Sequence, residues 1–523
     1  MSNADESELG NSSMLGQING EGHTAFSVSS RKVTAFRLYL FAAVAISVYL
    51  VVHLLTLARS PLPWFDDTFF ASVTESLQTN GDLRLLISPL WFDKPVYIYG
   101  PVYFFITGTF TALFGFDIFQ FRLPALLFSF GIVVVAFLLL RQQKVSPRIA
   151  AVACALLALD PTFYRGMHTG RMDSTALFFI LLGLLFLFKS QSVIEKRSFL
   201  YVAMSGLSAG VSLLTTPRPA YLVGLVGGVL FMWFLKRPSR EYFLKAGAWA
   251  AFCFSPWLAW FFHAFGNIPA LLNYYATLPG GTYVGGFHVR LEHYPLLAAI
   301  IILMIGQLRA GLKFASTELL LFSIGGIVGY YLLVHDEGGA YAFFMVPLAY
   351  LAIGCLARQW EWNRQQWLPA AIVGGLLLVN GLTYLSRNTF IWLEWEARDA
   401  QNAEEAVAAL IPRGSTVIGD DKYYFAVKKN GSDFQYLWRG GSLSERIAYH
   451  KNVYHPDFLI TVNNGESETV KTYREKLNLV KVGAIETPTP GIAAQWIASV
   501  ARRFGYLPDK GYGGTVWKRQ KKM

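Results

Sequence analysis

The chain has 523 residues, of which 54% are hydrophobic and only 15% are charged. A soluble globular domain carries about 25% charged residues, so the composition excludes an ordinary soluble protein. The formal net charge is +11, but the Lys and Arg residues are spread along the chain and form no single basic patch. This pattern argues against a nucleic-acid partner and is typical of a membrane protein whose basic residues set its orientation.

The N-terminal residues 1–35 are predicted to form a disordered cytoplasmic tail, because residues 1–30 are rich in Ser, Asn, Gly and Glu and contain no apolar core. The first apolar run covers about 36–58 and follows three basic residues, Arg31, Lys32 and Arg37. No cleavable signal peptide is visible, so we expect this run to remain as a membrane anchor. The positive-inside rule then predicts that the next loop, 59–120, is outside.

Further apolar runs predict about eleven transmembrane helices in all, within residues 36–385. After the first run, they cover about 121–140, 149–163, 175–188, 199–213, 219–235, 243–263, 295–308, 318–334, 340–357 and 367–385. The apolar run 96–116 is excluded from this count. If it crossed the membrane, every later basic cluster would lie on the other side of the membrane from the N-terminal basic cluster. We therefore expect it to lie in the membrane interface, within the first outer loop.

The composition changes after residue 386, and residues 386–523 predict a small soluble α/β domain on the outer face. Residues 398–410 have the pattern of an amphipathic helix, and 416–418 and 457–462 read as strands. The fold class expected from sequence is thus a polytopic α-helical membrane protein with interfacial helices in its first outer loop and a C-terminal α/β domain.

The groups that can carry chemistry all fall in the predicted outer loops. The first loop holds Asp66, Asp67, Asp93 and Lys94, and the loop at 164–174 holds Arg165, Arg171 and Asp173. A short loop at 215–218 adds Arg218. Carboxylates together with Lys and Arg suit a substrate whose phosphate is bound by cations and whose reaction needs a carboxylate base.

Each of these residues also has a purely structural interpretation. Asp67 and Asp173 are possible helix caps, and Asp93 with Lys94 is a possible surface ion pair. Arg165 and Arg171 are possible interfacial residues that snorkel toward water. The sequence leaves these alternatives open.

No metal site or cofactor is predicted. The three cysteines lie inside apolar runs and have no metal-ligand or disulfide spacing. His335 is followed by Asp336 and Glu337, but no second histidine stands at ligand spacing. A divalent metal is therefore an unsupported alternative.

Three ordered segments resemble GT-C glycosyltransferases, most closely the family of protein O-mannosyltransferases and aminoarabinose transferases. Asp66-Asp67-Thr-Phe-Phe-Ala-Ser resembles the family's Asp-Glu-x-x-Tyr-Ala motif, and Asp93-Lys94-Pro-Val-Tyr-Ile-Tyr resembles its Lys-Pro-Pro-x-x-Tyr element. The stretch from Leu113 to Ala125 is similar to its Phe-Gly … Arg-Leu-Pro-Ser segment. Arg171-Met-Asp173 occupies the place of a second acidic motif.

The chain departs from the family pattern at three places. The acidic pair is Asp-Asp, Lys94 is followed by a single proline, and the late Arg-Tyr-x-x-x-x-x-Pro segment has Ala340 where the family has arginine. The phosphate-binding role of that arginine therefore falls to another residue, for which Arg165, Arg171 and Arg218 are the candidates.

The resemblance implies an inverting transfer of a sugar from a polyprenyl-phosphate donor to an acceptor hydroxyl on a glycan, lipid or protein. It implies that Asp66 is the base and that Asp173 positions the acceptor or assists. Lys94 is expected to bind the donor phosphate, with Asp67, Tyr97, Arg165, Arg171 and Arg218 as further substrate-binding residues. The expected location is the bacterial inner membrane with a periplasmic active site, or the endoplasmic reticulum membrane in a eukaryote.

Two other classes of function remain as alternatives at this stage. Many spans with charged residues also suit a transporter or flippase of lipid-linked sugars, although no internal repeat is evident. A receptor or assembly subunit that binds through its C-terminal domain is the third possibility.

Overall fold

The structure is a computed structural model, and it describes residues 43–277, 291–309, 318–334, 341–358, 367–462, 467–503 and 511–520. The chain divides into two compact units, Met1–Leu55 and Thr56–Met523. The first described helix is Ala43–Thr56. All the elements discussed below lie in the second unit.

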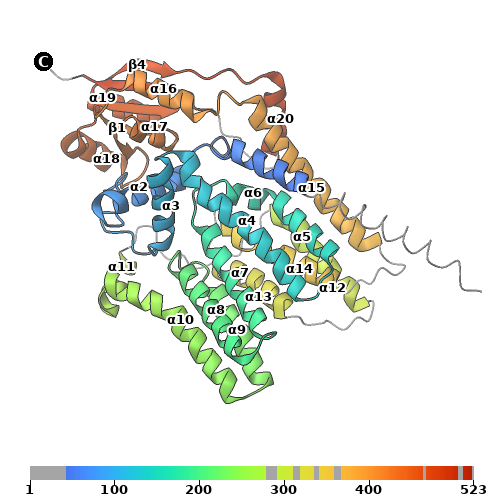
Figure 1. The fold of residues 1–523 in the computed structure, drawn as a ribbon. Helices are drawn as coiled ribbons and strands as arrows, with labels where there is room; N and C mark the ends of the chain where they lie inside the picture. The colour runs from blue at the N-terminus through green and yellow to red at the C-terminus, as the bar shows by residue number, and fades with distance from the viewer. Residues whose placement is uncertain are drawn as a thin grey trace, which may run out of the picture. The chain divides into compact units, whose positions relative to one another are not determined.

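Helices dominate the second unit up to residue 410 (Figure 1). They are α2 (Phe65–Asn80), α3 (Val102–Phe114), α4 (Ile118–Gln142), α5 (Pro147–Leu159), α6 (Pro161–Met167), α7 (Asp173–Ser190), α8 (Glu195–Leu213), α9 (Ala220–Lys236), α10 (Arg240–Ala264), α11 (Ile268–Ala276), η1 (Leu291–His293), α12 (Tyr294–Arg309), α13 (Glu318–Leu333), η2 (Tyr341–Phe344), α14 (Val346–Ala357), α15 (Trp367–Leu393) and α16 (Ala400–Leu410).

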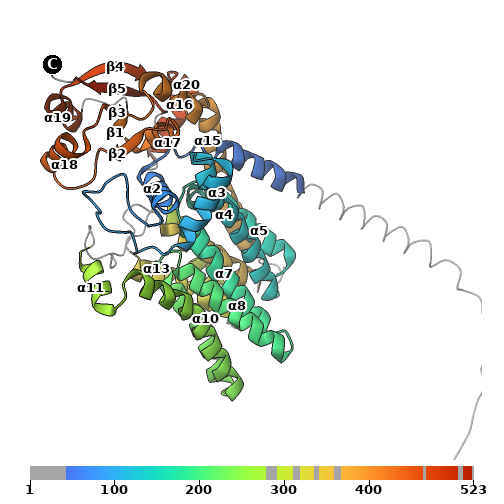
Figure 2. The same ribbon diagram turned by 60° about the vertical axis from the view of Figure 1, so that its left-hand side comes forward.

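The helices that follow α4 form a packed bundle, in which α7 lies between α4 and α8, and α8 lies against α10 (Figure 2). Small residues allow the closest of these contacts. A Cβ atom added to Gly206 on α8 would lie 2.4 Å from the backbone oxygen of Trp249 on α10. The backbones of α8 and α10 thus approach closely because residue 206 is a glycine.

Three described helices are long and apolar enough to cross a membrane, namely Ile118–Gln142, Asp173–Ser190 and Ala370–Leu393. The pair Pro147–Leu159 and Pro161–Met167 meets the same test together, with a bend of 66° between its halves. The bend falls at Asp160-Pro161, where proline removes a backbone donor and Asp160 accepts hydrogen bonds from the N–H groups of Thr162 and Phe163. The predicted number of about eleven spans stays a prediction.

The first outer loop contains two helices, α2 and α3. The predicted interfacial run 96–116 forms the 13-residue helix α3 preceded by irregular chain. A helix of 13 residues is about 20 Å long and is too short to cross a bilayer core of about 30 Å. Whether the run lies in the membrane interface stays a prediction, because α5 and α14, which are predicted to cross, are of similar length.

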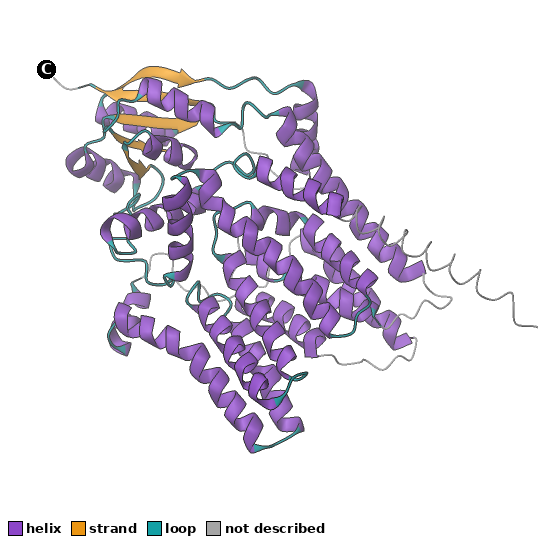
Figure 3. Ribbon diagram, viewed as in Figure 1, coloured by secondary structure: helices purple, strands orange, loops and turns teal. Residues whose placement is uncertain are grey.

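The C-terminal region contains a five-stranded sheet (orange in Figure 3) in the order β2-β1-β3-β5-β4. Its strands are β1 (Thr416–Gly419), β2 (Asp433–Tyr436), β3 (Phe458–Val462), β4 (Leu479–Ile485) and β5 (Gly514–Arg519), and its further helical segments are η3 (Asp421–Tyr423), α17 (Tyr424–Lys429), α18 (Leu443–Tyr449), η4 (His450–Tyr454), α19 (Glu468–Leu477) and α20 (Ile492–Arg503). Strands β2 and β3 pair in parallel with β1, whereas β5 lies antiparallel between β3 and β4. The predicted helix at 398–410 and the two predicted strands are present, and the structure adds three more strands.

Alternate residues of the sheet face two different cores. Val417 and Ile460 pack with α16 and α17, whereas Ile418 and Leu459 pack with α18 and α19. The first of these cores also contains Phe70 and other residues of α2 and α3. The sheet is therefore joined to the first outer loop by a shared hydrophobic core.

Candidate active site

The site begins at the first turn of α2. The helix starts at Phe65, so Asp66 and Asp67 both lie in its first turn, where the exposed N–H groups and the helix dipole favour negative charge. Neighbouring residues on a helix point about 100° apart, since one turn takes 3.6 residues. The two carboxylates consequently face different surroundings.

The side chain of Asp67 is fully buried and ion-paired with Arg122 of α4, at 2.5 Å between Oδ2 and Nη2. Arg122 also donates to the backbone oxygens of Leu57 and Pro61, at 2.9 and 2.7 Å. A buried charge needs this degree of pairing to offset its desolvation. Asp67 thus holds α2, α4 and the preceding loop together.

Asp67 also fixes the loop that carries Arg171. The backbone N–H of Gly170 donates to Asp67 Oδ1 at 2.6 Å. A Cβ atom at Gly170 would lie 2.1 Å from the ring of Phe121 and 2.9 Å from Asp67 Oδ1. Only glycine permits this approach, so the fold of the loop between α6 and α7 is tied directly to α2.

Arg171 joins the two remaining carboxylates. One of its Nη atoms is ion-paired with Asp66 Oδ2, and its Nε donates to Asp173 Oδ2 at 2.6 Å. Asp173 is the first residue of α7. Arg171 and Asp173 are nearly buried, whereas the side chain of Asp66 is 23% exposed. Asp66 is therefore the carboxylate of this group that solvent or a substrate reaches most easily.

Arg218, in the short connection between α8 and α9, completes the cluster. Its Nη2 donates to the hydroxyl of Tyr99 at 2.9 Å, and its Nη1 lies 3.9 Å from Asp173 Oδ1. The ring of Tyr341 faces both arginines, with its centroid 4.8 Å from Cζ of Arg171 and 4.1 Å from Cζ of Arg218. The cluster thus contains two carboxylates, two guanidinium groups and two tyrosines from five separate segments.

Several buried polar atoms of the cluster have no hydrogen-bond partner among the described residues. They are Trp64 Nε1, Arg171 Nη2, Asp173 Oδ1 and Arg218 Nη1. The contact of 3.9 Å between Arg218 and Asp173 is favourable for their charges but too long for a hydrogen bond. Unpartnered buried donors and acceptors are costly, and the N–H donors of Arg171 and Arg218 that have no partner among the described residues are suited to an anion.

The surroundings keep both arginines charged and Tyr99 neutral. Burial alone would lower the pKa of Arg171, but the charges of Asp173 and Asp66 outweigh it and raise that pKa. The pKa of Arg218 is raised in the same way, against burial, by Tyr99, Tyr341 and Asp173. Burial raises the pKa of Tyr99 to about 12, so its hydroxyl keeps its proton and accepts from Arg218 without carrying charge.

The other residues proposed from the sequence lie outside this cluster or have separate partners. Lys94 is exposed, and its Nζ donates to Thr277 Oγ1 at 3.3 Å. Tyr97 packs its ring against Trp260 and Phe265. Arg165 is half-buried in α6. The structure thus brings Asp66, Asp173, Arg171 and Arg218 together, but gives no contact of Lys94 or Tyr97 with them among the described residues.

The sequence interpretation did not select Tyr99, Tyr341, Trp64 or Arg122 as site residues. Tyr99 stands two residues after Tyr97 in the same motif, and the chain between them is irregular. Without a regular strand or helix, no periodicity indicates which of the two tyrosines faces the site. Tyr341 directly follows Ala340, the position at which the chain lacks the family's arginine.

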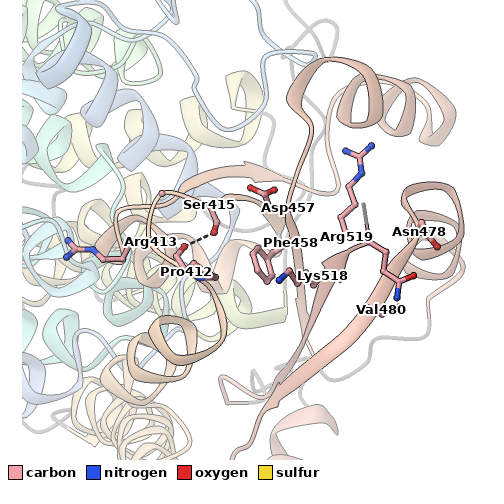
Figure 4. Close-up of a pocket in the computed structure, with 11 residues that line it drawn as sticks. Pro412, Arg413, Ser415, Asp457, Phe458, Asn478, Val480, Lys518 and Arg519 are labelled. Atoms are coloured by element: carbon pink, nitrogen blue, oxygen red, sulfur yellow. Dashed lines mark hydrogen bonds between the residues drawn. The ribbon is translucent and has the colours of Figure 1, made fainter. Parts of the chain in front are cut away.

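A separate hollow of about 910 Å³ lies at one end of the sheet's strands and is drawn in Figure 4. Its lining includes Ser415, Asp457, Asn478 and Arg519. These residues stand at the amino ends of β1, β3 and β4 and at the carboxyl end of the antiparallel β5. One backbone contact with the first outer loop, from the Tyr436 N–H to the Ile87 oxygen, comes from the opposite end, where β2 finishes. The hollow is therefore distinct from the Asp66 cluster.

No group of three or more His, Cys, Asp and Glu side chains that could hold a metal ion occurs within the described ranges. The segment with His335, Asp336 and Glu337 lies outside them. The role of a divalent metal therefore stays open.

Residues 93–260 match the model of the family described as dolichyl-phosphate-mannose-protein mannosyltransferase. This match covers α3 to α10 and includes Arg171, Asp173 and Arg218. No curated protein matches the sequence.

Among solved structures, the chain is similar to ArnT from Cupriavidus metallidurans. The apo structure of ArnT aligns with a TM-score of 0.62 at 15% identity, over 93% of this chain and 98% of ArnT. The structure of ArnT bound to undecaprenyl phosphate aligns with a TM-score of 0.62 at 13% identity, over 91% of this chain and 97% of ArnT. The chain has the fold of ArnT.

The match of residues 93–260 to the mannosyltransferase family model confirms the predicted resemblance to GT-C glycosyltransferases and with it the prediction of a glycosyltransferase enzyme. The expected fold class is supported in its coarse form, as a mostly helical protein with a small sheet. The three described helices that are long and apolar enough to cross a membrane support the prediction of an integral membrane protein in its coarse form. The roles of individual residues are taken up below as proposals.

Proposed function

We propose that the protein transfers a sugar from a polyprenyl-phosphate donor to a hydroxyl group of an acceptor, with inversion at the anomeric carbon. The observation that carries this proposal is the arrangement of Asp66, Arg171 and Asp173. A partly exposed carboxylate and two charged arginines, Arg171 and Arg218, belong to one connected cluster with Asp173, and each arginine has an N–H donor without a partner among the described residues. Such a set provides a base on one side and an anion site on the other.

Asp66 is the proposed base. Its carboxylate accepts the proton of the acceptor hydroxyl while the hydroxyl oxygen attacks the anomeric carbon. The bond from that carbon to the phosphate oxygen breaks in the same step, and its electron pair leaves with the phosphate. The exposure of Asp66, 23% against 4% for Asp173, favours Asp66 for direct contact with the acceptor.

Arg171 and Arg218 are the proposed ligands of the departing phosphate. Each has an N–H group without a partner among the described residues, at Nη2 and Nη1 respectively, in addition to its bonds with Asp66, Asp173 and Tyr99. A guanidinium group matches the geometry of phosphate oxygens and remains charged when buried. This assignment moves the phosphate-binding role expected of Lys94 to Arg218, and it leaves Lys94 for contacts farther out along the donor.

Asp173 and Asp67 are proposed as positioning residues. Asp173 holds Nε of Arg171 and faces Arg218, so it sets the spacing of the two cations. Asp67 holds the neighbouring Gly170 and is fully paired with Arg122, which argues for a structural role in place of the substrate-binding role expected from sequence.

The membrane arrangement proposed from the sequence fits this reaction. With the N-terminus in the cytoplasm, the loops that carry Asp66, Asp173 and Arg218 are all on the outer side of the bacterial inner membrane, where a lipid-linked donor would arrive from the bilayer. Residues 386–523 are proposed to lie on the same side, since the sheet shares a hydrophobic core with α2 and α3.

The function can be tested with purified protein in detergent and a panel of undecaprenyl-phosphate sugars, with glycan, lipid and peptide acceptors. We expect release of undecaprenyl phosphate coupled to formation of a glycoside whose anomeric configuration is inverted, as read by NMR. Because detergent abolishes the membrane barrier, transfer under these conditions excludes a purely transporting protein. If every donor stays intact while the protein moves lipid-linked sugars across vesicle membranes, the proposal is wrong.

A further inference from the structure

A segment of the C-terminal region, residues 436–441, is held against the first outer loop. The backbone N–H of Tyr436 donates to the backbone oxygen of Ile87 at 2.8 Å. The hydroxyl of Ser88 donates to the backbone oxygen of Arg439 at 3.3 Å. These two bonds fix the backbone on either side of residues 437 and 438, and with it the starting point of the Arg439 side chain.

Glycine makes this close approach possible. Gly440 and Gly441 have φ angles of 104° and 86°, which residues with a Cβ atom rarely adopt. A Cβ atom at Gly440 would lie 2.9 Å from Cβ of Leu90. The position of Arg439 therefore follows from the fold of the segment and is not a chance placement of a surface side chain.

The guanidinium group of Arg439 lies over two aromatic rings of the first outer loop. Its Cζ atom is 4.8 Å from the ring centroid of Phe65 and 5.3 Å from that of Trp91. The two rings meet edge to face at 5.4 Å. Phe65 and Trp91 are half-buried and Arg439 is exposed, so rings and cation together present an open surface to solvent.

The charge of Arg439 has no ion-pair partner among the described residues. Within the described part of the chain, Arg122, Arg171 and Arg218 each have a carboxylate within 4 Å, whereas Arg439 has none. An exposed guanidinium fork matches a carboxylate or phosphate group, and neighbouring aromatic rings supply apolar area of the kind that lines ligand sites. The combination suits an anionic group attached to a sugar ring.

We propose that Arg439, Phe65 and Trp91 form a binding subsite for an anionic saccharide portion of the acceptor. Phe65 of the subsite and the proposed base belong to the same turn of α2, because Phe65 directly precedes Asp66. The donor phosphate has its own ligands in Arg171 and Arg218, so the separate cation at Arg439 serves the second substrate. This inference rests on the proposed function and extends it, because it makes the C-terminal region a contributor to acceptor recognition.

The test measures binding of two trisaccharide probes to the purified full-length protein by calorimetry. Trigalacturonate carries a carboxylate on every ring, and maltotriose is its neutral counterpart. We expect trigalacturonate to bind more tightly than maltotriose, and Arg439→Gln to weaken trigalacturonate binding about tenfold, the usual effect of losing one charge-assisted contact. Arg439→Lys should restore part of the loss, and Trp91→Ala should weaken both probes.

Arg413→Gln is the matched control. Arg413 is an exposed arginine that lines the hollow at the other end of the sheet's strands from Tyr436 and Arg439. This variant should leave trigalacturonate binding unchanged. Equal binding of the probe by wild type and Arg439→Gln would overturn the inference, as would an equal loss in Arg413→Gln. Asp66→Asn separates the two claims, because it should abolish transfer while leaving trigalacturonate binding intact; retained transfer in that variant would contradict the proposed function and not the subsite.

Discussion

Asp66 is ion-paired with Arg171, although the two residues are 105 positions apart in the chain. Arg171 binds Asp173 through its Nε at the same time, so the first turn of α2 and the start of α7 share one guanidinium group. This link brings together the proposed base and the proposed anion site from loops that are separate in the sequence. The predictions below follow from how the link is held in place.

Asp67→Asn should destabilise the protein strongly, because it leaves the buried Arg122 without its carboxylate. Breaking a buried pair in this way costs about 3–5 kcal/mol. Thermal unfolding in detergent measures the loss as a lower melting temperature. Asp93→Asn, at an exposed residue of the same loop, is the control and should melt like the wild type. An Asp67→Asn protein with wild-type stability would show that the pair does not hold the fold.

Arg218→Gln should weaken binding of undecaprenyl phosphate by about tenfold or more, because it removes a charged ligand with an unused N–H group. Lys94→Gln should change the affinity much less, since Lys94 is exposed and bonded to Thr277. Both affinities can be measured by titrating the lipid into purified protein. The opposite order, with Lys94→Gln the weaker binder, would return the phosphate-binding role to Lys94.

The sheet region should lose stability as the pH falls from about 6.5 toward 4. Burial, with a contribution from Arg446, lowers the pKa of His450 to about 4, below the ordinary value of about 6.5. Between these pH values the unfolded chain binds a proton at this histidine that the folded chain does not. The free energy of unfolding therefore has its full value above pH 6.5 and decreases by about 1–3 kcal/mol as the pH falls toward 4. The effect is read from amide hydrogen exchange of β3 and α19 as a function of pH.

His450→Gln should flatten this pH dependence, because it removes the titrating group that bonds Tyr473 at 2.9 Å. His455→Asn is the matched control. His455 is exposed and has a φ angle of 52°, a conformation that asparagine tolerates. That variant should keep the wild-type pH profile, and a flat profile in His455→Asn alone would refute the assignment to His450.

Gly440→Ala should loosen the contact between the C-terminal region and the first outer loop. Residue 440 has a positive φ, and the Cβ atom of the new alanine would lie 2.9 Å from Leu90. Gly414→Ala is the comparison, because residue 414 also has a positive φ, of 77°, but its added Cβ atom would have no atom within 4 Å. The backbone strain of each is about 1–3 kcal/mol. We expect Gly440→Ala to lose more stability than Gly414→Ala, and only Gly440→Ala to lower sugar transfer. Equal losses in both would mean that the Leu90 contact contributes little.

The sequence was sufficient to predict much of the site because charge is rare in this chain. In an apolar protein the few carboxylates and arginines of the predicted outer loops stand out. The number of predicted membrane crossings between these loops places them all on one side of the membrane. Asp66, Asp173, Arg171 and Arg218 were selected on that basis. The helices were also recognisable, since long apolar runs and Pro or Gly boundaries mark them in the sequence.

The partners of Asp67 and Lys94 were not predictable in the same way. Asp67 and its neighbour Asp66 look alike in sequence, and only the packing of α2 against α4 decides which of them meets Arg122, 55 positions away. The irregular chain around Lys94 has no periodicity from which to infer direction. Strands β2, β4 and β5 escaped prediction. Strand β4 is largely exposed and shows no clear apolar alternation.

The most direct test of the account is sugar transfer by purified Asp66→Asn, compared with wild type in the same detergent. Asp66 makes an ion pair at a partly exposed position, so the variant should keep the wild-type melting temperature and its binding of undecaprenyl phosphate. The account predicts that transfer falls at least a hundredfold, in line with the loss of a general base. Turnover by Asp66→Asn at the wild-type rate would contradict it.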